Sequence, residues 1–238
     1  MSGHSHFKTV KATKDANDAK KGKIFSKLGR VVTLVAKEKG ADMLNPQLKA
    51  VIEKAREFNM PKENIERAIK KGTGELAGEI LEEVSFESFG PGGIAIIIEG
   101  ITDNKNRTLG EIKGILGQYG GKLAGEGAIR WMFDQKGSIT LSIENTPKEE
   151  LELLIIEAGA DDFIMEEKTA QVYTKPEDLE KVKKTLEEKN MKIDSVGLEW
   201  IAKEEILLDG KDKEKNQKLF EALDENDAVQ EVYSNLKI

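Results

Sequence analysis

The helical fold of the first third of the chain can be predicted from the stretch Asn59-Met-Pro-Lys-Glu-Asn-Ile-Glu-Arg-Ala-Ile-Lys-Lys-Gly72. Proline suits the first turn of a helix and glycine suits the position just past the last turn, so Pro61 and Gly72 mark the ends of a predicted helix. The isoleucine and alanine residues between them recur at helical spacing and are predicted to face inward. The opposite, solvent-facing side is predicted to carry Arg67, Lys70 and Lys71.

The residues before this stretch predict two more helices and a basic arm. Apolar residues at helical spacing predict one helix over residues 23–39 and a second over residues 46–58, with Asn45 as its N-cap. Residues 1–20 are polar and are predicted to form an extended or partly disordered arm. The sequence therefore predicts a basic helical domain with a flexible N-terminal arm over residues 1–79.

Charge is distributed unevenly along the chain. Residues 1–72 contain 17 Lys or Arg and 8 Asp or Glu, whereas the remaining residues contain 20 Lys or Arg and 36 Asp or Glu. The formal net charge of −7 therefore combines a cationic first third with an acidic remainder. Such asymmetry indicates a polyanionic partner for the first third of the chain.

Farther along the chain, short β-type runs replace the helical pattern. Residues 84–89 and 94–101 predict two strands joined by the turn Gly90-Pro-Gly-Gly93. A helix is predicted after Asn104, and residues 128–133 predict another strand. This ββαβ block lacks one helix of a two-layer α+β unit.

A second α+β pattern follows. Thr146-Pro147-Lys-Glu149 is a capping box that begins a helix, and the surrounding runs give the order βαββαβ, which is the ferredoxin-like pattern. The helix and strand predicted after it supply what the first block lacks. We therefore predict an α+β protein with an N-terminal three-helix domain followed by two ferredoxin-like α+β domains, the last inserted into the middle one. The predicted domain bounds are 1–79, 80–133 plus 204–238, and 134–203.

Few residues suggest catalysis, a cofactor or a metal. The chain has no cysteine, which excludes disulfides, thiolate metal sites and thiol catalysis. Its two histidines, His4 and His6, lie in the predicted arm and are fewer than the three or four fixed ligands of a protein metal site. Gly72-Thr-Gly-Glu-Leu-Ala77 has dinucleotide-binding spacing but follows a helix instead of a strand. We predict a protein that is not an enzyme, has no cofactor and no metal, and is cytoplasmic.

A cationic face opposite an apolar face lets a helix pack on its neighbours while its Lys and Arg side chains contact phosphates. Lys outnumbers Arg and no recognition-helix signature is evident, so the pattern favours backbone contacts over base reading. Lys105 and Arg107 form a secondary candidate spot, for which a capping segment is an equally good interpretation. The predicted phosphate contacts are Lys8, Lys11, Lys14, Lys20, Lys21, Lys23, Lys27, Arg30, Arg67, Lys70 and Lys71.

Several stretches, in order along the whole chain, closely resemble the YebC family, which includes the mitochondrial translational activator of cytochrome oxidase. The resembling stretches are Met1-Ser-Gly-His-Ser5, Asp18-Ala-Lys-Lys-Gly-Lys-Ile-Phe25, Asn59-Met-Pro-Lys-Glu-Asn-Ile-Glu-Arg-Ala-Ile-Lys-Lys-Gly-Thr-Gly74, Phe89-Gly-Pro-Gly-Gly93, Thr102-Asp-Asn-Lys-Asn-Arg-Thr108 and Trp131-Met-Phe-Asp134. Departures occur at His6-Phe7, where the family usually has Lys-Trp, and at Lys11-Ala-Thr-Lys14, where it has Lys-His-Arg-Lys.

This resemblance implies a helical N-terminal domain, two α+β domains and a regulator of gene expression that is not an enzyme. Family members are described as probable transcriptional regulators that bind DNA, while others act in translation at the ribosome. The primary hypothesis is a DNA-binding transcriptional regulator, and the alternative is a ribosome-associated translational activator that binds RNA. The acidic domains would then engage the ribosome or another protein. No membrane partner is expected. A less favoured hypothesis is a small-molecule-binding or catalytic protein that uses an inter-domain cleft near Gly90–Gly93 and Arg107.

Overall fold

The computed structural model describes residues 18–42, 45–143 and 147–237. The predicted arm, with Lys8, Lys11 and Lys14, lies outside these ranges except for its last three positions. Within them the chain forms two compact units: one holds the residues up to Arg130 together with those from Glu205 onward, and the other is Trp131–Glu204. None of the helices in the described ranges is both long enough and apolar enough to span a membrane.

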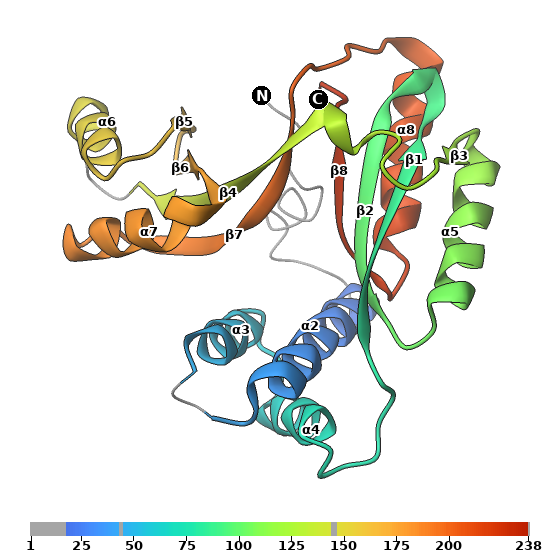
Figure 1. Ribbon diagram of the computed structural model, residues 1–238, viewed down its shortest axis with the longest axis horizontal. Helices are drawn as coiled ribbons and strands as arrows, with labels where there is room; N and C mark the ends of the chain where they lie inside the picture. The colour runs from blue at the N-terminus through green and yellow to red at the C-terminus, as the bar shows by residue number, and fades with distance from the viewer. Residues whose placement is uncertain (1–17, 43–44, 144–146, 238) are drawn as a thin grey trace. The chain divides into compact units, whose positions relative to one another are not determined.

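Three helices open the first unit, as the sequence predicts (Figure 1). Asn45 caps the second, because its side-chain oxygen accepts hydrogen bonds from the N–H groups of Gln47 at 2.9 Å and Leu48 at 3.3 Å. Buried side chains of all three helices, including Val32, Leu48 and Ile65, form a shared core. The helices are α2 (Asp18–Lys39), α3 (Pro46–Glu57) and α4 (Lys62–Gly72). The separation of this region from the following sheet as a domain of its own stays a prediction.

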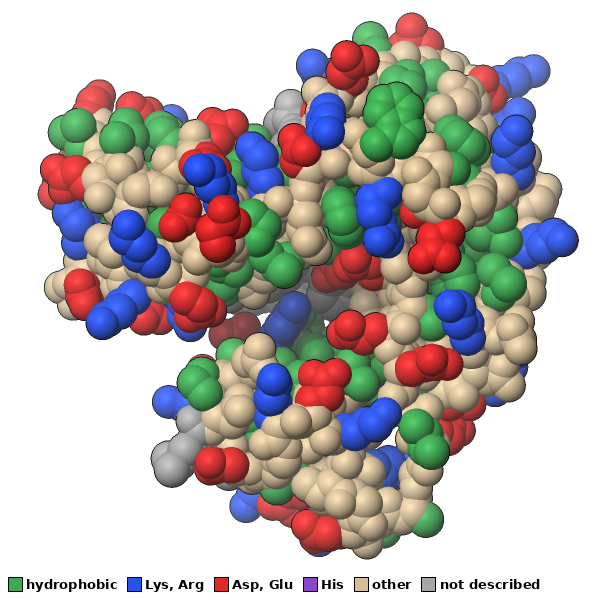
Figure 2. Space-filling model, in the orientation of Figure 1, with side chains coloured by type: hydrophobic (Ala, Val, Ile, Leu, Met, Phe, Trp, Pro, Cys, Tyr) green, Lys and Arg blue, Asp and Glu red, His purple; other side chains and the backbone are tan. Residues whose placement is uncertain are grey.

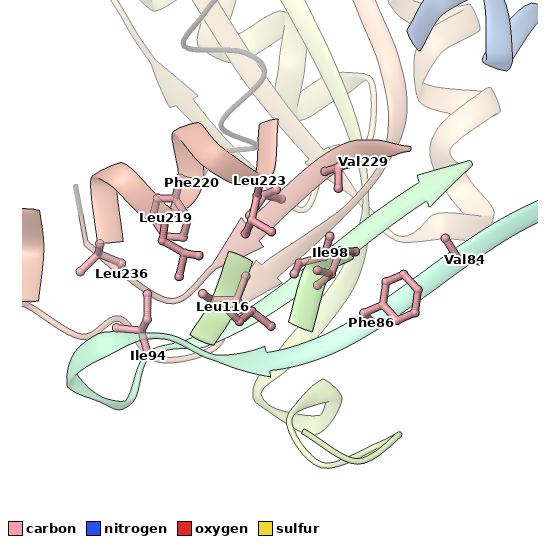
Figure 3. Close-up of a cluster of buried hydrophobic side chains, with 13 residues drawn as sticks. Val84, Phe86, Ile94, Ile98, Leu116, Leu219, Phe220, Leu223, Val229 and Leu236 are labelled. Carbon is pink, nitrogen blue, oxygen red and sulfur yellow. The ribbon is translucent and has the colours of Figure 1, made fainter. Parts of the chain in front are cut away.

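The first sheet has four antiparallel strands in the order β3-β1-β2-β8. Its elements are β1 (Glu82–Phe89), β2 (Ala95–Thr102), α5 (Lys105–Tyr119), β3 (Lys122–Leu123), α8 (Gly210–Asp224) and β8 (Val229–Ser234). Side chains of α5 and α8, such as Leu116 and Leu223, meet Phe86 and Ile98 of the strands in one buried cluster (Figure 3). The late α8 and β8 segments therefore complete the first sheet, as the sequence predicts. The elements of this sheet follow one another along the chain as ββαβαβ. The ferredoxin-like pattern is βαββαβ, so the connectivity of this first α+β region differs from that pattern.

A side chain of α8 holds the turn between β1 and β2 through a hydrogen bond. The side-chain amide of Asn216, which is fully buried, donates hydrogen bonds to the carbonyl oxygens of Pro91 at 2.9 Å and Asp212 at 2.8 Å. A Cβ atom on Gly90 would lie 2.5 Å from the Asn216 side-chain oxygen, so only glycine fits there. The turn predicted at Gly90-Pro-Gly-Gly93 is confirmed. Gly92 and Gly93 have φ values of 74° and 79°, a conformation that favours glycine.

The strand predicted over residues 128–133 is wrong. Arg130–Met132 forms a 3-10 turn, and only Phe133 belongs to a strand. The cause is a tertiary contact, because the buried carboxylate of Glu87 accepts hydrogen bonds from three backbone N–H groups of this loop. The distances are 2.7 Å from Gly127, 2.8 Å from Ile129 and 3.2 Å from Arg130. Backbone donors held in this way cannot join a strand ladder.

Glu87 is expected to make stability depend on pH. Burial alone would raise the pKa of this carboxyl, but the N–H groups of Ile129, Gly127 and Arg130, together with the charge of the Arg130 side chain, lower it below its ordinary value of 4.5. Because the folded pKa is lowered, the stabilisation is fully present above about pH 4.5 and is lost as the pH falls through the folded value.

Glu87→Gln should therefore lower the free energy of unfolding by about 1–3 kcal/mol at pH 7. The difference from wild type should shrink in urea titrations repeated below pH 4. Glu83→Gln is the control, since Glu83 lies exposed on the same strand. A difference that stays constant across this range would contradict the expectation.

The second unit has the predicted ferredoxin-like arrangement, with the chain order βαββαβ and strand order β5-β6-β4-β7. All neighbouring strands pair antiparallel. Side chains of both helices, including Ile155 and Val182, pack against Ile139 and Val172 of the sheet. Thr146 of the predicted capping box lies outside the described residues. The elements are β4 (Phe133–Ser142), α6 (Lys148–Glu157), β5 (Asp162–Met165), β6 (Thr169–Thr174), α7 (Leu179–Glu188) and β7 (Ile193–Ala202).

Candidate nucleic-acid interface

The C-terminal half of α4 presents three cations to solvent. Arg67, Lys70 and Lys71 are exposed, and none of them forms an ion pair within the described part of the chain. The opposite side of the helix buries Ile65 and Ala68 in the three-helix core, which fixes the direction of the charged side chains. This arrangement leaves three positive groups available to an anion, as the sequence predicts for this helix.

The cations of α2 are placed differently from the prediction. They are expected on a solvent face opposite the apolar stripe, yet Lys27 is 3% exposed and its Nζ lies 2.7 Å from a carboxylate oxygen of Asp224. Lys23 lies 2.9 Å from a carboxylate oxygen of Glu225. The Arg30 guanidinium donates to the carbonyl of Ile101 at 3.1 Å. In the structure these side chains bind the acidic residues and backbone of the same unit.

The reason is that α2 has two buried faces. Leu28 and Val32 pack in the three-helix core, whereas Leu34 packs against Leu81 and Ile101 next to the first sheet. Periodicity within one helix identifies its apolar residues but not the number of partners that surround it. Lys37 also takes part in this second contact, because its Nζ donates to the carbonyl of Leu81 at 2.9 Å.

The remaining predicted contacts fall near the start of α2. Lys20 belongs to the helix, but its side chain lies outside the described set, and Lys21 is exposed. The secondary spot at the start of α5 is a cap: the Asn104 side chain accepts the N–H of Arg107 at 3.0 Å. The Arg107 side chain lies 2.5 Å from Asp103 and lowers the pKa of that carboxyl. Of the two predicted cations there, Lys105 is exposed and Arg107 is paired.

A groove of about 470 Å³ lies between α2 and α4. Arg67, Lys71 and Asn64 line it from α4, at helical spacings that place them on one face. The α2 side is lined mainly by small residues, and Phe25 and Met60 add apolar surface. The small residues are Gly22, Ser26, Gly29 and Thr33. Sequence reasoning missed this wall, although its spacing of three or four residues is a readable signal.

Acidic and basic side chains are interspersed on the face of the molecule that Figure 2 shows. The charge asymmetry of the sequence thus does not produce one uniformly basic surface on that face. Within the described ranges, no group of three or more His, Asp or Glu side chains is placed to hold a metal ion. The site therefore consists of a helix surface with cations and an adjoining groove.

These features define a class of α+β protein in which a basic three-helix region precedes two four-stranded antiparallel sheets with helices. The model of the TACO1/YebC N-terminal domain matches residues 5–75, and the model of the TACO1/YebC second and third domain matches residues 81–236. The chain belongs to the TACO1/YebC family.

Relatives match over nearly their full length. A probable transcriptional regulatory protein from Thermoanaerobacter pseudethanolicus is 46% identical over 100% of this chain and 98% of its own. One from Thermotoga maritima is 45% identical over 100% of this chain and 94% of its own. The crystal structure of a conserved hypothetical protein from Aquifex aeolicus superposes with a TM-score of 0.86 at 40% identity. That match covers 96% of this chain and 95% of the other.

Proposed function

We propose that this protein regulates gene expression by binding nucleic acid through its three-helix region, with DNA as the first candidate. One observation carries the proposal: Arg67, Lys70 and Lys71 of α4 are exposed and form no ion pair in the described ranges, while Lys23 and Lys27 of α2 are paired with acidic residues. Phosphate contacts position a protein on nucleic acid and release counterions from it. The names of the relatives, which describe probable transcriptional regulators, support this function.

Structured RNA is the second candidate, and one observation favours it. Arg67 and Lys71 line a concave groove, whereas reading of the major groove of duplex DNA uses a helix that inserts into that groove. RNA is recognised mostly through its shape, backbone and unpaired segments. A translational role at the ribosome would use the same contacts.

Neutralising α4 tests the proposal. The triple variant Arg67→Gln, Lys70→Gln and Lys71→Gln should weaken binding of a duplex DNA and of a ribosomal RNA fragment by about tenfold or more, measured by fluorescence anisotropy. Loss of three phosphate contacts should also reduce the slope of log K against log salt by about 2.7 for duplex DNA. The DNA or RNA that wild type binds more tightly at equal salt is the preferred target.

A matched control removes three positive charges elsewhere. Lys175, Lys181 and Lys184 lie on the second unit, and their replacement by Gln changes the net charge by the same amount. Binding that falls equally in both triple variants would show a general charge effect and would contradict a site on α4. Binding that is unchanged in the α4 variant would remove the proposal.

A further inference from the structure

The groove between α2 and α4 differs from a flat phosphate-binding surface in being concave. Its volume of about 470 Å³ lies within the range of roughly 300–1,000 Å³ that is typical of small-molecule sites. A recess of this size admits one protruding group, whereas a duplex presents a broad and continuous surface. The shape therefore favours a ligand that can insert a single unit.

The two walls have complementary chemistry. On α4, the guanidinium of Arg67 and the ammonium of Lys71 provide positive charge, and Asn64 adds an amide that both donates and accepts hydrogen bonds. Glu79, which is exposed, is the acidic residue among the lining side chains, so cations outnumber acids there. The polar wall therefore suits an anion such as a phosphodiester.

The other wall is open and partly apolar. A Cβ atom added to Gly22 would meet no atom within 4 Å, so a ligand can approach the α2 backbone closely. Phe25 is half-buried and lines the groove together with Met60. An aromatic side chain next to cations is the combination that binds single-stranded nucleic acid, because bases stack on the ring while the backbone follows the positive charge.

We propose that the groove seats one nucleotide of a single-stranded segment, with its phosphate at Arg67 and Lys71 and its base against Phe25. This inference rests on the proposed function and names the class of nucleic acid that the site takes. It places the sequence-independent phosphate contacts and the unpaired base on opposite walls of one recess.

Filling the groove without removing charge tests this inference. Gly22→Leu and Ser26→Leu each place a larger side chain in the recess, and leucine is a better helix former than glycine or serine. Each variant should weaken binding of a 12-nucleotide single strand by about tenfold, the loss expected for one stacked base. Binding of a 12-base-pair duplex should change less than twofold. Anisotropy titrations at one salt concentration measure both.

Gly114→Leu is the matched control. Gly114 lies on α5, and a Cβ atom there also meets no atom within 4 Å. This variant should bind both nucleic acids as wild type does, and thermal unfolding should show that all three variants are folded. If one groove variant fails to fold, the other still carries the test.

The outcomes separate the two proposals. Unchanged single-strand binding in a folded groove variant overturns the inference, and so does an equal loss for single strand and duplex. If neutralising α4 still weakens binding in either case, the proposed function stands alone. Wild type that binds neither nucleic acid at low salt overturns both.

Discussion

Lys27→Glu is expected to lower the free energy of unfolding by about 3–5 kcal/mol, because it breaks an ion pair whose cation is almost wholly buried. The side chain of Lys27 is 4% exposed and that of Asp224 is 28% exposed, with 2.7 Å between Nζ and the carboxylate oxygen. A glutamate there would replace the buried cation with a carboxylate that faces the carboxylate of Asp224. Urea denaturation followed by circular dichroism measures the loss.

A charge swap identifies the interaction that is lost. Adding Asp224→Lys to Lys27→Glu restores opposite charges at the same two positions, so the double variant should regain a substantial part of the stability. Lys23→Glu is the control. Its partner Glu225 is 65% exposed, so the change should cost less than about 1 kcal/mol.

This experiment also separates two roles for Lys27. The sequence predicts a phosphate contact, which would leave stability nearly unchanged on substitution and reduce nucleic-acid binding. The structure shows an internal ion pair, for which the opposite is expected. If Lys27→Glu keeps normal stability but loses nucleic-acid binding, Lys27 belongs to the nucleic-acid interface.

Gly72→Ala is expected to have the second large effect, because α4 crosses α2 at this glycine with no room for a side chain. A Cβ atom would lie 2.4 Å from the carbonyl oxygen of Thr33 and 2.7 Å from the Cβ of Ala36. Both are firmly held in α2, and backbone cannot yield as a flexible side chain does. Overpacking of this kind costs about 1–3 kcal/mol and sometimes more.

A second glycine provides the contrast for this prediction. Gly117 is on α5, and a Cβ atom there meets nothing within 4 Å. Gly117→Ala should be neutral or slightly stabilising because alanine favours helix by up to about 1 kcal/mol. Thermal unfolding of both variants compares them directly, and a Gly72→Ala protein as stable as wild type would show that the helices can separate without cost.

Gly72 illustrates how a residue can be identified correctly for the wrong reason. The sequence predicts a glycine just past the helix end, but the helix includes Gly72 and its C-cap is Thr73. No positive φ is involved at Gly72, whereas the C-cap of α5, Gly120, has φ of 83°. The requirement at Gly72 comes from the close approach of another helix, which a one-helix pattern cannot reveal.

Local patterns determined the elements whose causes are local. Asn45 and Pro46 define the start of α3 through a cap that involves only the next residues, and the apolar spacing of α2 and α4 identifies the three-helix core. The order βαββαβ of the second unit was equally readable, because turn residues separate its strands and helices. The motifs also led to the family that the chain belongs to.

Tertiary structure alone decided which charges are available. The excess of positive charge in the first 72 residues is a property of the sequence, but Asp224 and Glu225 lie about two hundred positions from Lys27 and Lys23 and neutralise them only in the folded chain. Glu87 likewise turns a predicted strand into a loop by binding its N–H groups. Ion pairs and hydrogen bonds between distant residues depend on packing. The sequence therefore shows where the cations occur, and only the folded structure shows that Arg67, Lys70 and Lys71 face solvent while Lys27 is buried.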